Sequence, residues 1–139
     1  MHNGRTLKTL IESFIRESLG KDALIFYENQ SPKGIQGKTW IRVKISVFTN
    51  NANTLNLTSK TGQGSINIHV FSPLNKGVKQ AEDIADTLAN AFNNCSKLQD
   101  DDGNVEIILR DGFTHSDDAI EDGYYRKSYA SIFRFFRRG

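Results

Sequence analysis

Apolar residues recur at helical spacing in two stretches of the chain. In the stretch 6–19 they fall at positions 7, 10, 11, 14, 15 and 19, which share one face of a helix. Gly20 follows where a helix commonly ends on glycine. The stretch 78–95 repeats the pattern, and its early carboxylates suit the positive end of a helix dipole. The sequence therefore predicts two amphipathic helices.

Strict alternation predicts strands elsewhere. Residues 40–48, WIRVKISVF, place branched apolar side chains on one side and polar ones on the other. Residues 64–71 alternate in the same way, and the fifteen mostly polar residues 49–63 lie between them. These two segments are expected to form an antiparallel pair joined by a long loop. Three further strands are predicted at 23–27, 105–109 and 129–136.

The order of these elements predicts the fold class. Strands run together in the middle and two helices flank them, which favours α+β over alternating β-α-β units. We expect a mixed, mainly antiparallel β-sheet with two packed α-helices, in a single domain over residues 1–139. The segment 110–123, RDGFTHSDDAIEDG, is expected to be a second polar loop.

Composition narrows the functional classes. The chain has 139 residues, a net charge of +2 and one cysteine, Cys95, so no internal disulfide can form. Cys95 is expected to be a small buried hydrophobic residue of the second helix, which fits a reducing compartment. No apolar run approaches the roughly 20 residues of a membrane span, and the first residues lack the apolar segment of a signal peptide.

The turn FSPLNKGV connects a strand to a helix, as phosphate-binding turns do. It lacks both G-x-x-x-x-G-K-[ST] and G-x-G-x-x-G. Glu82, Asp83 and Asp86 follow it and would repel a phosphate. We expect the turn only to redirect the chain.

Residues suited to catalysis or metal binding are sparse. His69 is expected on the polar side of its strand, facing solvent or a partner. His115 lies near Asp117 and Asp118, but the segment lacks HExxH spacing, EF-hand spacing and cysteine partners. No G-x-S-x-G motif occurs. We therefore predict no enzyme activity, no catalytic residue, no metal site and no cofactor.

The C-terminal segment YYRKSYASIFRFFRRG mixes cations with aromatic residues, as surfaces that bind single-stranded nucleic acid do. However, Phe133 and Phe135 share one side of the strand, and Arg134 lies on the other. A core strand whose end is solvated by Arg137 and Arg138 is the simpler interpretation, and nucleic-acid contact is the alternative.

Three segments together resemble a known family: WIRVKISV, GSINIHVFSPLNKGVKQAEDIADTLANAF and YYRKSYASIFRFF. They resemble the tail terminator proteins of long-tailed bacteriophages, including the minor tail or tail-completion proteins of siphophages. The resemblance centres on a glycine-led strand ending in hydrophobic-Phe-x-Pro, a glycine turn and a helix with A-x-x-I-A-D-x-L. It extends from Trp40 to Phe136.

The resemblance implies a structural viral protein with a role in virion assembly. Members form a ring, typically a homo-hexamer, on the head-proximal end of the tail tube, where the ring ends tube polymerisation and supports head–tail joining. The implied partners are further copies of the chain, the tail tube protein and the head–tail connector or neck proteins. No membrane and no specific nucleic acid are expected. The implied location is the virion tail, after assembly in the host bacterial cytoplasm.

The long polar loops and the polar side of the 40–48 strand are the expected contact surfaces. The candidate interface residues are Arg42, Lys44, Asn51, Asn53, Thr54, Asn56, Thr58, Lys60, Asp117, Asp118, Arg137 and Arg138. Three other functions remain open: a head–tail connector or adaptor of the neck, a nucleic acid-binding protein, and a small metal-dependent enzyme using His115.

Overall fold

The computed structural model describes residues 3–49, 59–74, 79–95, 97–100, 103–109 and 113–138. The two helices are α1 (Asn3–Leu19) and α2 (Lys79–Asn94). Seven strands accompany them, and their bounds are β1 (Ile25–Tyr27), β2 (Trp40–Thr49), β3 (Ser59–Pro73), β4 (Lys97–Gln99), β5 (Val105–Leu109), β6 (Thr114–Glu121) and β7 (Tyr124–Arg138).

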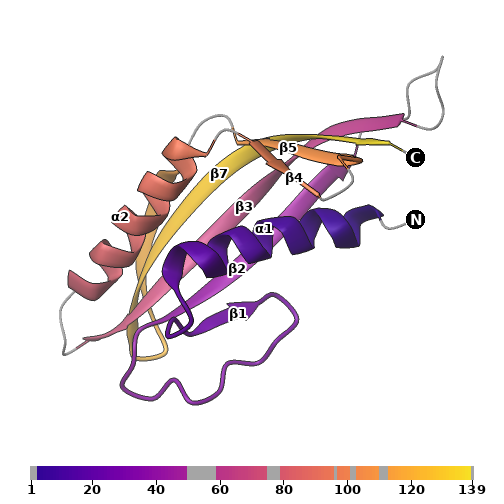
Figure 1. Cartoon of the computed structure of the whole chain (residues 1–139). Coiled ribbons are helices and arrows are strands. Elements are labelled where there is room, and N and C mark those ends of the chain that lie inside the picture. The colour runs from indigo at the N-terminus through magenta and orange to yellow at the C-terminus, as the bar shows by residue number, and fades with distance from the viewer. Residues whose placement is uncertain are drawn as a thin grey trace.

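The strands form one curled sheet in the order β1-β2-β3-β7-β5-β4, and β6 also pairs with β7 (Figure 1). Only the short β1–β2 pair is parallel, and all other pairs are antiparallel. The β3–β7 pair is the longest, with fifteen consecutive partners from Ser59↔Arg138 to Pro73↔Tyr124. On the far edge of β7, β5 pairs with its C-terminal part and β6 with its N-terminal part. The predicted α+β class with a mixed, mainly antiparallel sheet is confirmed.

Both helices cover the same face of the sheet, which we call the inner face (Figure 1). Helix α1 buries Leu7, Ile11 and Ile15, and Phe14 contacts Phe92 of α2 at 5.4 Å between ring centroids. Gly20 ends α1 with a φ of +86°, as its position predicts. The inner-face residues of the strands complete the core: Ile41, Val43, Ile45, Ile66, Ile68, Val70, Val105, Ile107, Leu109, Tyr129, Phe133 and Phe135.

Two glycines of β3 make room for aromatic rings of β7. Gly62 pairs with Phe135, and Gly64 pairs with Phe133. A Cβ on Gly62 would lie 2.7 Å from the Phe135 ring, and one on Gly64 would lie 2.5 Å from the Phe133 ring and collide with the backbone oxygen of Ser46. Glycine in a strand often marks such a close approach. The glycine-led strand seen in the sequence is therefore a packing requirement.

Several expected loops are strands. The predicted loop 110–123 is wrong for residues 114–121, which form β6 and make a hairpin with β7. Asp122 and Gly123 join them with φ of 51° and 82°, the two positive values of a type I′ turn. The first five residues of β3 (59–63) were also expected in a loop, β4 was not predicted, and β7 begins five residues earlier than predicted. The turn residues 75–78 and the loop residues 50–58 lie outside the described residues.

Two side chains differ from expectation at the ends of elements. Cys95 lies just past the end of α2 and is half-buried against the core, where its Sγ donates to the Lys97 carbonyl at 3.4 Å. Arg137 was expected to be solvated, but only 9% of it is exposed and its guanidinium lies 5.9 Å from the centre of the Phe135 ring. Burial lowers the pKa of Arg137.

We predict that Gly64→Ala lowers the free energy of unfolding by about 1–3 kcal/mol, the usual cost of overpacking a core. The added methyl group would force the Phe133 ring or the backbone of Ser46 to move. Ser46→Ala serves as the control, because the Ser46 side chain lies on β2 and points to the face of the sheet opposite Gly64. It is expected to change the free energy of unfolding by under about 0.5 kcal/mol. Urea denaturation measures both. Equal stability of the two variants would contradict the packing assigned to Gly64.

Candidate interaction surface

The face of the sheet opposite the helices, which we call the outer face, carries no helix in the described structure (Figure 1). Strand register decides which side chains reach it. One row across the sheet is Phe48, Gln63, Arg134 and Ile108, and another is Arg42, His69, Ser128 and Asp117. The outer face is therefore built from the even-numbered residues of β2 and β7 and the odd-numbered residues of β3 between Gln63 and Phe71.

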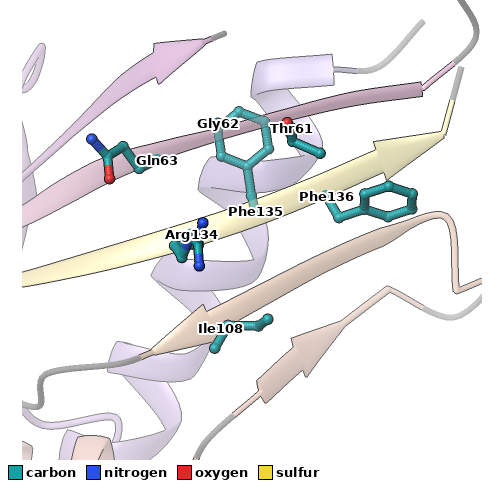
Figure 2. A pocket seen from close by; sticks show the side chains of 7 residues that line it. All are labelled: Thr61, Gly62, Gln63, Ile108, Arg134, Phe135 and Phe136. Carbon is teal, nitrogen blue, oxygen red and sulfur yellow. The ribbon is translucent and has the colours of Figure 1, made fainter. Parts of the chain in front are cut away.

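Exposed apolar side chains gather at one end of this face around Arg134. We call this group the outer patch, and its apolar members with their exposed fractions are Phe48 (55%), Ile132 (43%), Ile108 (42%) and Phe136 (37%). Figure 2 shows Arg134 beside Ile108 and Phe136, at a hollow of about 310 Å³. Clustered exposed apolar residues mark contact sites for other macromolecules, and an arginine among them is typical of protein interfaces.

The other end of the outer face is closed by aromatic packing. Trp40 and Phe71 stack with ring centroids 4.1 Å apart, and Tyr124 meets Trp40 edge-on at 6.1 Å. The Tyr124 hydroxyl donates to the Ile35 carbonyl at 2.9 Å, which ties the 28–39 loop over this end. Arg42 lies over the Trp40 ring at 5.3 Å. A hollow of about 260 Å³ remains here, but Trp40 and Phe71 in its wall are 5% and 3% exposed. The outer patch exposes more apolar surface and is the better candidate for a contact with another chain.

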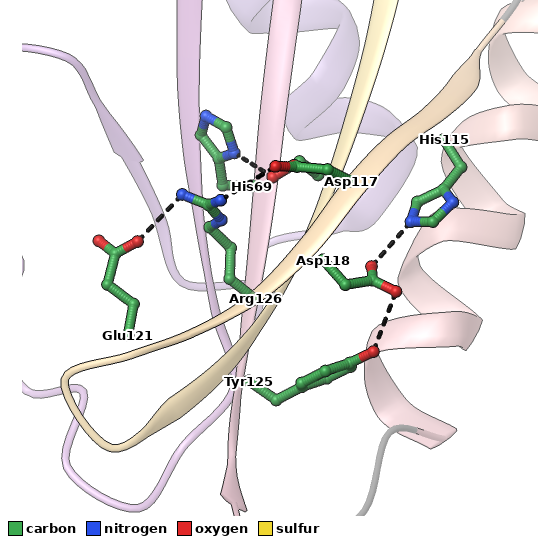
Figure 3. Close-up of polar contacts among 8 residues, drawn as sticks. His69, His115, Asp117, Asp118, Glu121, Tyr125 and Arg126 are labelled. Atoms are coloured by element: carbon green, nitrogen blue, oxygen red, sulfur yellow. Dashed lines mark hydrogen bonds and ion pairs between the residues drawn. The ribbon is translucent and has the colours of Figure 1, made fainter.

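A polar network joins the β6–β7 hairpin to the middle of the outer face (Figure 3). Arg126 donates to Glu121 at 3.0 Å and to Asp117 at 3.4 Å. His69 Nδ1 and the Ser128 hydroxyl lie 2.7 Å apart. Burial lowers the pKa of His69, and the nearby Arg126 charge lowers it further. His69 thus lies on the predicted side of its strand but is half-buried and bonded within the chain.

A bulge in β6 separates His115 from Asp117. The register shifts between these two residues, so His115 and Asp118 lie on the inner side and Asp117 lies on the outer face. Asp118 lies 2.7 Å from His115 Nε2 and accepts a hydrogen bond from Tyr125 at 3.0 Å (Figure 3). The hydrogen bond from His115 is the main cause of the lowered pKa of Asp118.

This separation weakens the metal-dependent enzyme as an alternative. His115 and Asp118 form a pair, and Asp117 turns to Arg126 on the other face. No group of three or more His, Cys, Asp or Glu side chains able to hold a metal ion occurs within the described part of the chain. Among the described helices, none is long and apolar enough to cross a membrane.

The predicted interface residues do not form one cluster. Arg42 and Lys44 lie on the outer face of β2, as predicted, and Asp117 shares that face three strands away. Lys60 and Arg138 lie in β3 and β7. Asp118 lies on the inner side of β6, and Arg137 is buried. The remaining five, Asn51, Asn53, Thr54, Asn56 and Thr58, lie outside the described residues.

The outer patch itself was missed, although its signal is present in the sequence. Phe48 is an even number of residues from Arg42 and Lys44 along β2, so all three point to the same side of the strand. Phe136 and Arg134 share a side of β7 for the same reason. An apolar residue on the polar side of an alternating strand is the sign of an exposed contact residue. Strand register was needed to show that these residues meet.

Comparisons with known proteins agree with this architecture. A family model described as phage tail terminator protein matches residues 7–128. Eighteen chains among solved structures match, and one has a TM-score of 0.66 at 13% sequence identity, covering 95% of this chain and 96% of its own. That likeness shows a shared fold alone. No curated protein matches.

The lowered pKa of His69 predicts a pH dependence of stability. The unfolded chain, with a histidine pKa near 6.5, binds more protons than the folded chain just below that pH. The free energy of unfolding should therefore fall as the pH drops through about 6.5, and His69→Asn should reduce this slope. Denaturation at pH 7.5 and 5.5 measures it, and an NMR titration follows the imidazole directly. A His69 pKa above 6.5 in the folded chain would contradict the effects assigned to burial and to the charge of Arg126.

Proposed function

The chain belongs to the phage tail terminator family, and we propose that it caps the tail tube as a ring that ends tube polymerisation. The family consists of structural proteins of the virion tail, which associate with other tail and neck proteins. Within this role the proposal is specific. A ring, typically a hexamer, lies on the head-proximal end of the tube and offers the joining surface for the head or neck. The whole chain, 1–139, acts as one domain.

The outer patch is the observation that carries this proposal. Four large apolar residues are exposed together at one end of the outer face, and no described helix covers that face. A protein that works alone rarely leaves such residues together at the surface. The hollow beside Arg134 is lined by Ile108, Phe135 and Phe136 together with Thr61, Gly62 and Gln63, and this mixture of an arginine with aromatic and apolar side chains suits a protein contact.

Ring geometry explains why two different surfaces are needed. A closed ring uses a heterologous interface, in which each subunit meets its two neighbours through unlike surfaces. Contact with the tube needs a third surface, and we assign the outer patch to it. The polar residues Asn51, Asn53, Thr54, Asn56 and Thr58 are proposed to contact the tube or a neighbouring subunit. Assembly takes place in the host bacterial cytoplasm.

The proposal is tested with phage that lack this chain, complemented with wild-type or altered protein. Without the chain, tails should exceed their normal length and fail to join heads. Phe136→Ser should reproduce this defect, because it removes the largest apolar side chain beside Arg134. Leu74→Ser, an exposed apolar residue outside the outer patch, is the matched control and should restore normal tails. Electron microscopy measures tail length and head joining.

Two results would contradict the proposal. Tails of normal length in the absence of the chain would show that it does not end polymerisation. Tails of normal length that fail only to join heads would instead support a connector or adaptor of the neck.

The loop between β2 and β3 offers a second prediction. Replacing residues 50–58 with a short glycine-containing turn should leave the melting temperature nearly unchanged, because the entropy of loop closure depends weakly on length. Tails should nevertheless be too long or fail to join heads. Melting curves and tail lengths are measured on the same variant, since an unfolded protein would also give defective tails. A folded variant with normal tails would show that this segment only connects the two strands.

A further inference from the structure

Among the described residues the sheet has open edges at β1–β2, at β6 and at the three-residue β4, and those of β2 and β6 are the longer ones. Strand β1 pairs with β2 only as far as Val43, so residues 44–49 of β2 have no partner strand on that side. On the opposite edge, β6 pairs with β7 and with no other described strand. An unpaired edge presents a row of backbone N–H and C=O groups that another strand can bind.

The open edges of β2 and β6 carry opposite charges. Residues 44–49 of β2 carry one charge, Lys44, because Arg42 lies where β1 pairs, and β6 carries Asp117, Asp118 and Glu121. Pairing β6 with β6 would bring these carboxylates together and would be unfavourable. Pairing β6 of one copy with β2 of another brings opposite charges together. The charge pattern therefore favours a head-to-tail contact between copies over a two-fold dimer through β6.

The shapes of the two edges also match. Ile120 of β6 is 70% exposed and lies on the inner-face side of its strand, opposite Tyr125. Beside the open edge of β2, on the same side of the sheet, lies a hollow of about 290 Å³, whose wall combines Tyr27, Val43 and Ile45 with the polar residues Lys8, Glu12, Glu28 and Asn29. When a sheet continues from one copy to the next, Ile120 reaches this hollow.

We propose that β6 of one subunit pairs with residues 44–49 of β2 in the next subunit and so closes the ring. Strands β2, β3, β7 and β6 alternate in direction, so a neighbour related by rotation presents its β2 antiparallel to β6. The proposed register places Ile120 opposite Ile45, Glu121 opposite Lys44 and Ala119 opposite Ser46. The proposed contact begins at Lys44, directly after the last residue of β2 that pairs with β1, and the inner and outer faces continue from one subunit into the next. The inference rests on the proposed function, since it supplies the subunit contact of that ring.

A disulfide between copies tests the register directly. Ser46→Cys and Ala119→Cys are introduced together with Cys95→Ser, and the protein is oxidised both at high concentration in solution and in assembled tails. Within one chain, β3 and β7 lie between these positions, a separation of about 14 Å at ordinary strand spacing, so no internal bond can form. Denaturing gels should show a ladder of covalent multimers that ends at a closed ring. Ser46→Cys with Asp117→Cys, which lies two residues out of register, is the matched control and should cross-link far less. Absence of the ladder in both samples, or equal cross-linking of the control, would overturn the proposal.

Charge reversal provides a second test that does not depend on cysteine. Lys44→Glu and Glu121→Lys should each weaken the subunit contact by roughly tenfold, and the double variant should recover most of it. Asp83→Lys reverses an exposed, ion-paired carboxylate on α2 and should have no effect. Light scattering measures the oligomer, and melting curves confirm that each variant folds. Recovery in the double variant supports the pairing, and unchanged oligomers in both single variants overturn it.

The two proposals fail in different ways. A ladder from a protein that is absent from the tube end would refute the proposed function and leave the strand pairing intact. Terminated tails that give no ladder would refute the strand pairing and leave the proposed function intact.

Discussion

The fifteen-residue pairing of β3 with β7 fixes the rest of this structure. A slip of one residue would turn every inner-face side chain of β7 toward the outer face. Gly62 and Gly64 prevent that slip, because the Phe135 and Phe133 rings occupy the space that a side chain at position 62 or 64 would need. A slip would bring a β3 residue with a side chain against these rings. With this register set, β2 follows on one edge and β5 and β6 on the other. The same constraint thus decides both the core and the composition of the outer face.

A sheet covered by helices on one face leaves two kinds of surface for assembly. The edges offer backbone hydrogen bonds and opposite charges, which suit contacts that repeat from copy to copy. The outer patch offers exposed apolar residues around Arg134, which suit a contact with a different protein. The proposed function uses both kinds, because in it the chain binds its own copies and the tube. The arrangement needs no catalytic group, in keeping with a family of structural proteins.

The sequence predicted the elements whose periodicity is strong. Both helices, the core residues of β2 and β3 and the inner position of Phe133 and Phe135 follow from simple alternation or helical spacing. Strand β6 was missed because its side chains are almost all polar, and an edge strand with little burial lacks an apolar side. The Asp122-Gly123 pair was the available signal, because Asp-Gly favours the two-residue turn of a β-hairpin. It should have been given more weight than the polar composition of residues 114–121.

The contact surface was harder to predict than the fold for a related reason. Arg42 and Lys44 were found from one strand, but the outer patch combines residues from β2, β5 and β7 that only sheet order brings together. Arg137 was misjudged because a charge at the end of a chain is usually solvated, whereas here the ring of Phe135 lies beneath its guanidinium. Single-strand patterns show which side a residue faces, and the pairing of distant strands decides its neighbours.

We propose that this chain forms one closed ring at the head-proximal end of the tail tube. A cryo-electron microscopy reconstruction of that end of the tail, at a resolution that separates strands, tests it most directly. We expect a single ring of this fold on the last tube layer, with the outer patch against the tube. Density for this fold repeated along the tube, or its absence from the head-proximal end, would show that the chain does not cap the tube.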